Sequence, residues 1–139
     1  MIRLVLLAFA LGLATLPARA DEPSGISTTV LQRAVTDNTG APLRYPKGKP
    51  EITTMLIELA PGAVTPPHRH PYPLAAYVLE GEIEIRADGG KVNRYKAGDA
   101  FVEALDRTHQ GRNVGTGPVR ILVTVVGVAG KPYIVPAPK

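Results

Sequence analysis

Residues 62–86 read GAVTPPHRHPYPLAAYVLEGEIEIR. The apolar stretch Ala75–Leu79 is followed by Glu82–Arg86, in which polar and apolar side chains alternate as they do in a half-buried strand. The turn sequence Asp88-Gly89-Gly90 comes next, and Val92–Tyr95 then has the length and position of the returning strand. This part of the sequence therefore predicts antiparallel strands joined by a tight turn.

The rest of the chain shows the same pattern of short strands separated by turns. The strongest strand signal is Val119–Val128 (VRILVTVVGV), and the other strand-like runs are Thr28–Val35, Ile52–Leu59 and Ala100–Ala104. The stretch Asp37–Pro50 is rich in Pro, Gly and charged residues, which predicts a loop. No stretch after the first twenty residues shows a convincing helical period, so the sequence predicts an all-β sandwich or barrel.

The first twenty residues have the pattern of a secretory signal peptide. Arg3 precedes the uncharged, mostly apolar run Leu4–Leu16, and Ala18-Arg19-Ala20 places small residues where a signal peptidase cleaves. A transmembrane anchor is the alternative, but the apolar run is shorter than the about 20 residues that span a bilayer. Cleavage after Ala20 would leave residues 21–139 as one domain, secreted or periplasmic, with no stable membrane anchor.

The charge and the cysteine content exclude several classes of function. The sequence has 16 Lys+Arg against 12 Asp+Glu, and loss of Arg3 and Arg19 with the signal peptide leaves 14 against 12. These charges are scattered and are not interleaved with aromatic residues, so nucleic acid is not expected as a partner. The absence of Cys excludes disulfides, thiolate nucleophiles and Cys-ligated metals.

The three histidines of the chain are the candidate metal ligands. His68 and His70 are separated by Arg69, and residues i and i+2 of a strand point to the same face. This pair alone also fits an exposed turn without a metal. His109 lies 39 residues further on, which leaves room for two hairpins to bring the chain back alongside the pair. Three imidazoles on one divalent ion, with the remaining positions open, form a known catalytic arrangement.

The spacing of these histidines resembles the two motifs of the cupin superfamily. The first motif is Gly, five residues, His-x-His, three or four residues, Glu, six residues and Gly; four of its five fixed positions match, at Gly62, His68, His70 and Gly81. The second is Gly, five residues, Pro-x-Gly, two residues, His, three residues and Asn; three of its five fixed positions match, at Gly98, His109 and Asn113. The chain therefore resembles a small single-domain cupin of the type-2, quercetin-dioxygenase-like kind.

This resemblance implies a jelly-roll β-barrel, or double-stranded β-helix, with a metal ion in its mouth. His68, His70 and His109 fall on three of the usual four ligand positions, and the implied cofactor is one divalent transition metal: Fe, Mn, Ni, Cu or Zn. The fourth ligand would be Glu, but Leu74 occupies that position. Either a three-His site persists with an open coordination position, or the metal site is lost and the barrel binds an organic ligand.

Two further residues are candidates for a catalytic role. Glu103 lies on the strand that leads to His109, and it either faces inward, as a substitute ligand or a general base, or faces outward on the polar side. Tyr72 follows the histidine pair closely and is a candidate for the pocket wall. Tyr77 is nearby as well, but we expect it to belong to the core.

The remaining polar and glycine positions of the motifs have less specific interpretations. Arg69 and Arg112 are candidates for holding an acidic substrate at the rim, with a solvated surface as the alternative. Asn113 is expected to satisfy main-chain groups at a turn, and Gly62, Gly81 and Gly98 are expected to be turn positions.

The sequence thus predicts an exported cupin that binds one divalent metal through three His and acts on a small-molecule substrate. The leading hypothesis is a metal-dependent, dioxygenase-like enzyme for an oxygen-bearing compound such as an enediol, a β-diketone or a flavonol. The alternative is a non-catalytic periplasmic protein that binds a metal or a small ligand, because one barrel fold hosts many functions. A third hypothesis is a scaffold that acts through dimerisation, since the resemblance also implies a homodimer.

Overall fold

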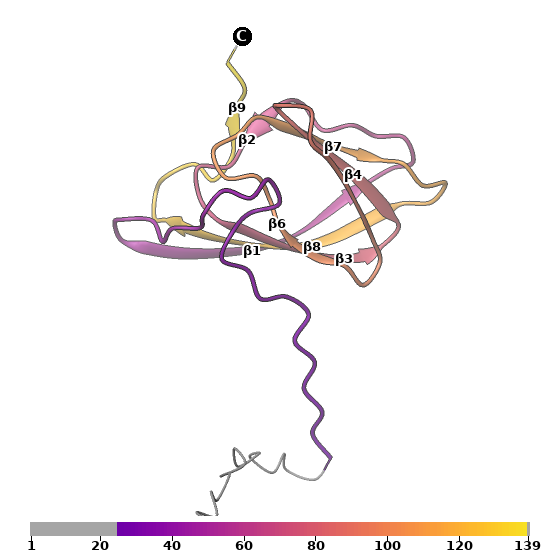
Figure 1. Cartoon of the computed structure of the whole chain (residues 1–139), viewed down its shortest axis with the longest axis horizontal. Helices are drawn as coiled ribbons and strands as arrows, with labels where there is room; N and C mark the ends of the chain where they lie inside the picture. The colour runs from indigo at the N-terminus through magenta and orange to yellow at the C-terminus, as the bar shows by residue number, and fades with distance from the viewer. Residues whose placement is uncertain (1–24, 139) are drawn as a thin grey trace, which may run out of the picture.

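The computed structural model describes residues 25–138 and shows two antiparallel β-sheets that face each other (Figure 1). The first sheet has four strands in the order β1-β8-β3-β6: β1 (Pro50–Leu59), β8 (Val119–Val128), β3 (Leu74–Glu80) and β6 (Ala100–Val102). The second has five strands in the order β5-β4-β7-β2-β9: β5 (Val92–Lys96), β4 (Glu82–Ala87), β7 (His109–Asn113), β2 (His68–Arg69) and β9 (Val135–Pro136). None of the described residues forms a helix, and so none forms one that could cross a membrane. The predicted all-β fold is confirmed.

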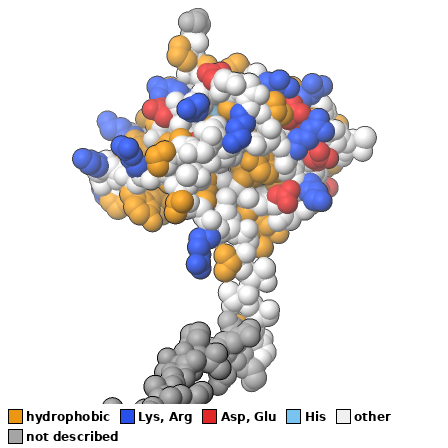
Figure 2. Space-filling view, viewed as in Figure 1, with side chains coloured by type: hydrophobic (Ala, Val, Ile, Leu, Met, Phe, Trp, Pro, Cys, Tyr) orange, Lys and Arg blue, Asp and Glu red, His pale blue; other side chains and the backbone are white. Residues whose placement is uncertain are grey.

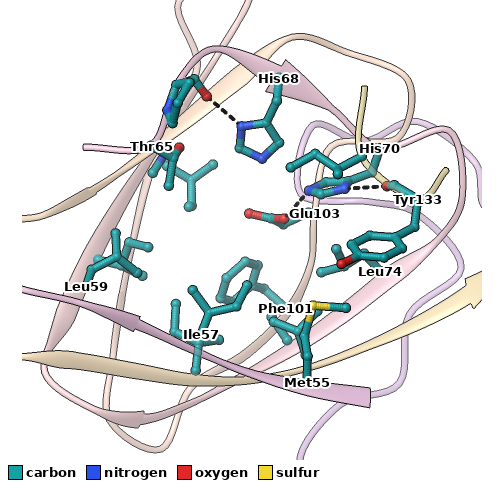
Figure 3. Close-up of a pocket in the computed structure, with 18 of the residues that line it drawn as sticks. Met55, Ile57, Leu59, Thr65, His68, His70, Leu74, Phe101, Glu103 and Tyr133 are labelled. Atoms are coloured by element: carbon teal, nitrogen blue, oxygen red, sulfur yellow. Dashed lines mark hydrogen bonds and ion pairs between the residues drawn. The ribbon is translucent and has the colours of Figure 1, made fainter. Parts of the chain in front are cut away.

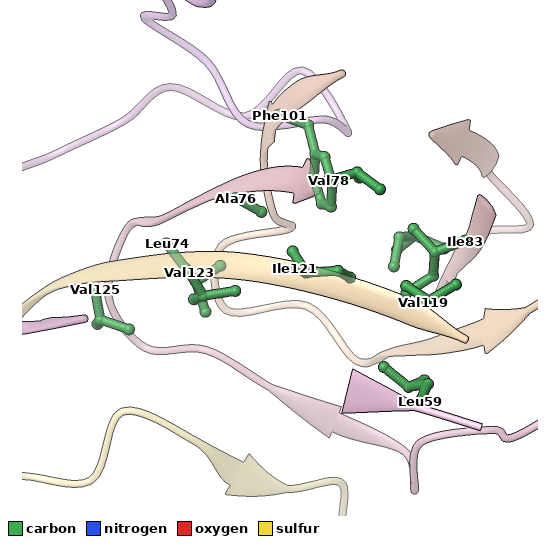
Figure 4. Close-up of a cluster of buried hydrophobic side chains, with 11 residues drawn as sticks. Leu59, Leu74, Ala76, Val78, Ile83, Phe101, Val119, Ile121, Val123 and Val125 are labelled. Carbon is green, nitrogen blue, oxygen red and sulfur yellow. The ribbon is translucent and has the colours of Figure 1, made fainter. Parts of the chain in front are cut away.

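The four-stranded sheet is built on one long pair of strands. β1 and β8 pair in an unbroken register that begins with Pro50 opposite Val128 and ends with Leu59 opposite Val119. Burial alternates along β8, as expected for a strand with one face in the core, and the inward-facing residues are Val119, Ile121, Val123 and Val125. Figure 4 shows these side chains packed with those of β3 and β4, so the core lies between the two sheets.

Most of the predicted strands are confirmed, with ends that shift by two residues at most. The prediction for Thr28–Val35 is wrong: these residues are mostly exposed and pair with no strand, so their β propensity has no neighbouring ladder to join. β7 and β9 lack a strand signal, since the first reads HQGRN and the second consists of Val and Pro. They are strands because neighbouring strands pair with them.

A buried asparagine fixes one end of the barrel. Asn113 is 1% exposed, and its side-chain Nδ2 donates to the carbonyl oxygens of Leu59, Ala60 and Gly117 at 2.9–3.0 Å. Its Oδ1 accepts a hydrogen bond from the N–H of Gly115 at 2.9 Å. The expectation that Asn113 satisfies main-chain groups at a turn is therefore confirmed, and the side chain is not available to a ligand.

The direction of alternate side chains settles two other expectations. Tyr77 does not belong to the core: it is half-buried on the outer face of β3, because Ala76 and Val78 take the inward positions. Gly81, at the turn after β3, has a φ of 79°, and a Cβ atom there would lie 2.4 Å from the carbonyl oxygen of Pro118. Only glycine fits this turn without displacing main-chain atoms.

The surface charge agrees with the scattered charges of the sequence. On the face shown in Figure 2, Lys and Arg side chains are distributed among Asp and Glu side chains. Residues 1–20, predicted to be a signal peptide, lie outside the described residues.

Candidate metal centre

The three histidines come together where the adjacent strands β2 and β7 pair. His68 and His109 lie directly opposite each other in the antiparallel register, and His70 follows His68 by two residues. The ring centroids are separated by 4.5 Å for His68–His109, 4.9 Å for His68–His70 and 5.1 Å for His70–His109. One nitrogen atom of each ring lies within 4.8 Å of the corresponding atoms of the other two, which is close enough for a shared metal ion.

A main-chain carbonyl group holds the Nδ1 atom of each imidazole. The contacts, with Nδ1–O distances of 2.7, 2.8 and 2.9 Å, are those of His68 with Pro66, His70 with Tyr133 and His109 with Arg107. A carbonyl oxygen only accepts hydrogen bonds, so each Nδ1 carries a proton. In a neutral ring, Nε2 then has the free lone pair, which is the state in which imidazole binds a metal.

The carboxylate of Glu103 lies against two of these imidazoles. Its Oε2 is 3.0 Å from Nε2 of His70 and 3.6 Å from Nε2 of His109, and the side chain is 14% exposed. Figure 3 shows Glu103 pointing into the cavity beside His70. Burial raises the pKa of Glu103, but its contacts with His109 and His70 together outweigh burial and lower the pKa to about 2. Of the two orientations considered from the sequence, Glu103 therefore takes the inward one, as a carboxylate.

Burial and the Glu103 carboxylate act differently on His68 and His109. Burial lowers the pKa of His68 despite the hydrogen bond to Pro66, and the neighbouring imidazoles add to that effect. Burial also disfavours the charged ring of His109, but the Glu103 carboxylate outweighs it and raises the pKa of His109. Within residues 25–138, the buried Nε2 of His109 has no hydrogen-bond partner. A divalent transition metal would provide that partner, so the donor set fits such an ion.

A cavity of about 500 Å³ opens beside the histidines. Its wall is mainly aliphatic and aromatic and comes from both sheets, with contributions from Met55, Ile57, Leu74, Ile85, Phe101, Ile121 and Val123. The polar side chains in the lining are Thr65, His68, His70, Glu103 and Tyr133. No Lys or Arg is among the described residues that line the cavity. The arrangement can therefore accommodate a molecule with an apolar body whose polar end reaches the imidazoles.

The other residues singled out from the sequence lie in different environments. Leu74 lines the cavity and is 2% exposed. Tyr72 is not among the lining residues, and its ring packs against the hydrophobic core instead. Arg69 forms an ion pair with Asp106, and Arg112 is exposed, so neither arginine side chain lines the cavity.

The C-terminal segment forms a wall that the motifs do not indicate. Tyr133, Ile134 and Pro136 all line the cavity, and β9 pairs with β2 so that Pro136 lies opposite His68. Figure 3 shows the ring of Tyr133 extending into the cavity, while its carbonyl group holds His70. The only signal in the sequence is the presence of Tyr and Ile between prolines in the stretch KPYIVPAPK, residues 131–139.

The fold and the site together define a β-barrel protein with three clustered histidines at an apolar cavity. A family model described as "Cupin domain" matches residues 55–125, just over half of the chain. The protein therefore belongs to the cupin family, and the resemblance drawn from the two motifs is confirmed. The matched region contains all three histidines and Glu103.

Individual proteins give a similar result at the level of the fold. The chain is 34% identical over 91 residues to germin-like protein subfamily 2 member 2 of Arabidopsis thaliana, covering 60% of this chain and 42% of that protein. An oxalate oxidase structure matches with a TM-score of 0.53 and 26% identity, over 62% of this chain and 46% of that one. A protein with a double-stranded β-helix domain from Klebsiella pneumoniae matches with a TM-score of 0.53 and 23% identity, over 70% of this chain and 86% of that one. The chain spans less than half the length of the first two.

Proposed function

We propose that this protein is an exported cupin that binds one divalent metal ion through His68, His70 and His109 and acts as a dioxygenase-like enzyme. The observation that carries the proposal is the cluster of three imidazoles, each held at Nδ1 by a main-chain carbonyl, of which those of His68 and His70 line an apolar cavity. A transition metal supplies there a Lewis-acidic, redox-capable centre for the oxygen atoms of a substrate. The residues of the chain would hold the ion and orient the substrate.

The chemistry of the cavity supports a particular class of substrate. Its volume of about 500 Å³ and its mainly apolar wall suit a molecule with an extended apolar body. Oxalate, for which the oxalate oxidase is named, is a small dianion without any such part, and no Lys or Arg among the described lining residues would neutralise it. An enediol, a β-diketone or a flavonol, with neighbouring oxygen atoms at one end, fits the cavity better.

Export and dimerisation rest on the sequence alone. The pattern over residues 1–20 supports export to the periplasm or the medium, and the mass of the exported protein would show whether cleavage follows Ala20. The homodimer stays a prediction that the mass of the native protein in solution would test.

Metal loading and oxygen consumption test the proposed function. The purified protein is stripped with a chelator and reloaded separately with Fe(II), Mn(II), Ni(II), Cu(II) or Zn(II), and oxygen uptake is measured with a panel of enediols, β-diketones and flavonols. We expect about one ion per chain and oxygen uptake with at least one metal, and none in the stripped control. Absence of metal binding would refute the proposal. Metal binding without turnover of any compound would favour the non-catalytic binding protein.

A further inference from the structure

We propose that Glu103 is the fourth protein ligand of this metal centre, and that it replaces, from the neighbouring strand, the carboxylate that the cupin motif places at position 74. The inference rests on the proposed metal site and adds a ligand to it. It assigns Glu103 to the metal rather than to proton transfer, and it explains how the chain retains its histidines although Leu74 cannot coordinate.

The register of the four-stranded sheet makes the two positions equivalent. Ala75 of β3 lies opposite Val102 of β6, and one step further the N–H of Glu103 donates to the carbonyl oxygen of Leu74 at 3.0 Å. Residues that face each other in an antiparallel pair have Cβ atoms about 4.5–5.5 Å apart and point to the same side of the sheet. Both Leu74 and Glu103 accordingly line the cavity. A Glu side chain can therefore bring its carboxylate to the same place from either position.

The distances from Glu103 to two of the histidines are those of ligands that share one ion. Ligands about 2.1 Å from a metal lie about 3.0 Å apart at right angles and about 3.4 Å apart at the tetrahedral angle. Oε2 of Glu103 is 3.0 Å from Nε2 of His70 and 3.6 Å from Nε2 of His109. The carboxylate oxygen thus lies beside the two nitrogen atoms that the main-chain carbonyls leave free for a metal.

Charge supports the same assignment. Three neutral imidazoles would leave the full charge of a divalent ion in a largely apolar cavity, which is costly, and one carboxylate ligand halves that charge. Because Nδ1 of His70 donates to the carbonyl oxygen of Tyr133, a hydrogen bond from Nε2 of His70 to Glu103 would require a doubly protonated ring. A metal ion satisfies both atoms without that second proton. Glu103 is thus placed either in an imidazolium ion pair or on a metal, and these alternatives can be separated by experiment.

The experiment measures the affinity of the stripped protein for Co(II), by competition with a fluorescent chelator and by the visible absorption of the bound ion. The isosteric variant Glu103→Gln removes the charge. The double variant Leu74→Glu/Glu103→Leu moves the carboxylate to the other strand, and the single variant Glu103→Leu is its reference. Glu84→Gln is the matched control, because Glu84 lies on the outer side of β4 and pairs only with Arg86 and Arg94. Thermal melting of the metal-free proteins reports whether each variant is folded.

We expect Glu103→Gln to weaken Co(II) binding at least about 10- to 100-fold, the range found even for groups that only support metal ligands. Glu84→Gln should change the affinity less than about twofold, because this equally covered carboxylate lies on the outer side of β4, away from the ion. The double variant should bind more tightly than Glu103→Leu alone and restore an absorption spectrum close to that of the wild type. A residue that only positioned His70 would not be replaced from another strand.

Two results would overturn the inference, and they are distinguishable from failure of the proposed function. If the wild type binds Co(II) and Glu103→Gln binds it equally well, Glu103 is not a ligand, although the three-histidine centre stands. If the folded double variant binds no better than Glu103→Leu, positions 74 and 103 are not equivalent. A wild type that binds no Co(II), nor any other metal of the series, refutes the proposed metal centre and the fourth ligand together.

Discussion

The two sheets of the barrel differ in regularity, and the candidate metal centre lies mainly on the irregular one. In the four-stranded sheet, β1 and β8 are ten residues long each and pair along their whole length. In the five-stranded sheet, β2 and β9 have two residues each, yet β2, the residue directly after it and the neighbouring strand β7 carry the three imidazoles. Long, regular pairing supplies the rigid apolar wall, whereas short strands bring histidines and main-chain carbonyl groups close together.

The short strands have a direct chemical consequence. The carbonyl groups of Pro66, Arg107 and Tyr133 lie just outside the strands and accept the Nδ1 protons of the histidines. In a long strand, carbonyl groups are used in the ladder between strands. Fixing the proton on Nδ1 and the lone pair on Nε2 thus depends on main chain that leaves the sheet next to each ligand.

The largest effect should follow from removing an imidazole from the irregular sheet. We expect His68→Ala to weaken metal binding about 100-fold, because a typical binding free energy of about 10–16 kcal/mol shared by four ligands is about 3 kcal/mol each. Arg69→Ala is the matched control on the same strand, since Arg69 pairs with Asp106 and does not line the cavity. Titration with Zn(II) against a competing chelator measures both. Equal losses in the two variants would contradict the assignment of the site.

A change in the core of the regular sheet should lower the stability of the fold and leave the metal affinity nearly unchanged. Val78 on β3 is 0% exposed and does not line the cavity. We expect Val78→Ala to lower the free energy of unfolding by about 2 kcal/mol, from lost burial and a new void, while metal affinity stays within about twofold. Urea denaturation of the metal-free protein and the same Zn(II) titration measure the two quantities. A loss of metal affinity as large as that of His68→Ala would show that the core of the regular sheet also determines metal binding.

The same contrast explains what could be predicted from the sequence. The strands of the regular sheet could be predicted because alternation of apolar residues, as in Val119–Val128, is a local property of the sequence. The histidine cluster could be predicted because its motif fixes the spacing of the histidines along the chain. β9 could not be predicted, since Val135 and Pro136 form a strand only through their pairing with β2.

The orientation of Glu103 could not be derived from the sequence for a related reason. Phe101, Val102 and Glu103 do not alternate in burial as a half-exposed strand would, because Val102 on the outer side is also covered. The N–H of Asn38 donates to the carbonyl oxygen of Val102, which brings the loop before β1 over this strand. Likewise, the pairing of Glu103 with Leu74 is a register between distant segments that no local pattern encodes.

The smallest effect concerns the C-terminal wall, where one residue serves the site through two separate groups. The carbonyl oxygen of Tyr133 accepts the Nδ1 proton of His70 at 2.8 Å, whereas its ring lines the cavity (Figure 3). Tyr133→Phe keeps the carbonyl group and removes only the hydroxyl group, so we expect Zn(II) affinity to change less than about twofold, well below the effect of losing a group that supports a ligand. The same titration measures this affinity. A loss of tenfold or more would mean that the hydroxyl group, and not the main chain, supports the metal centre.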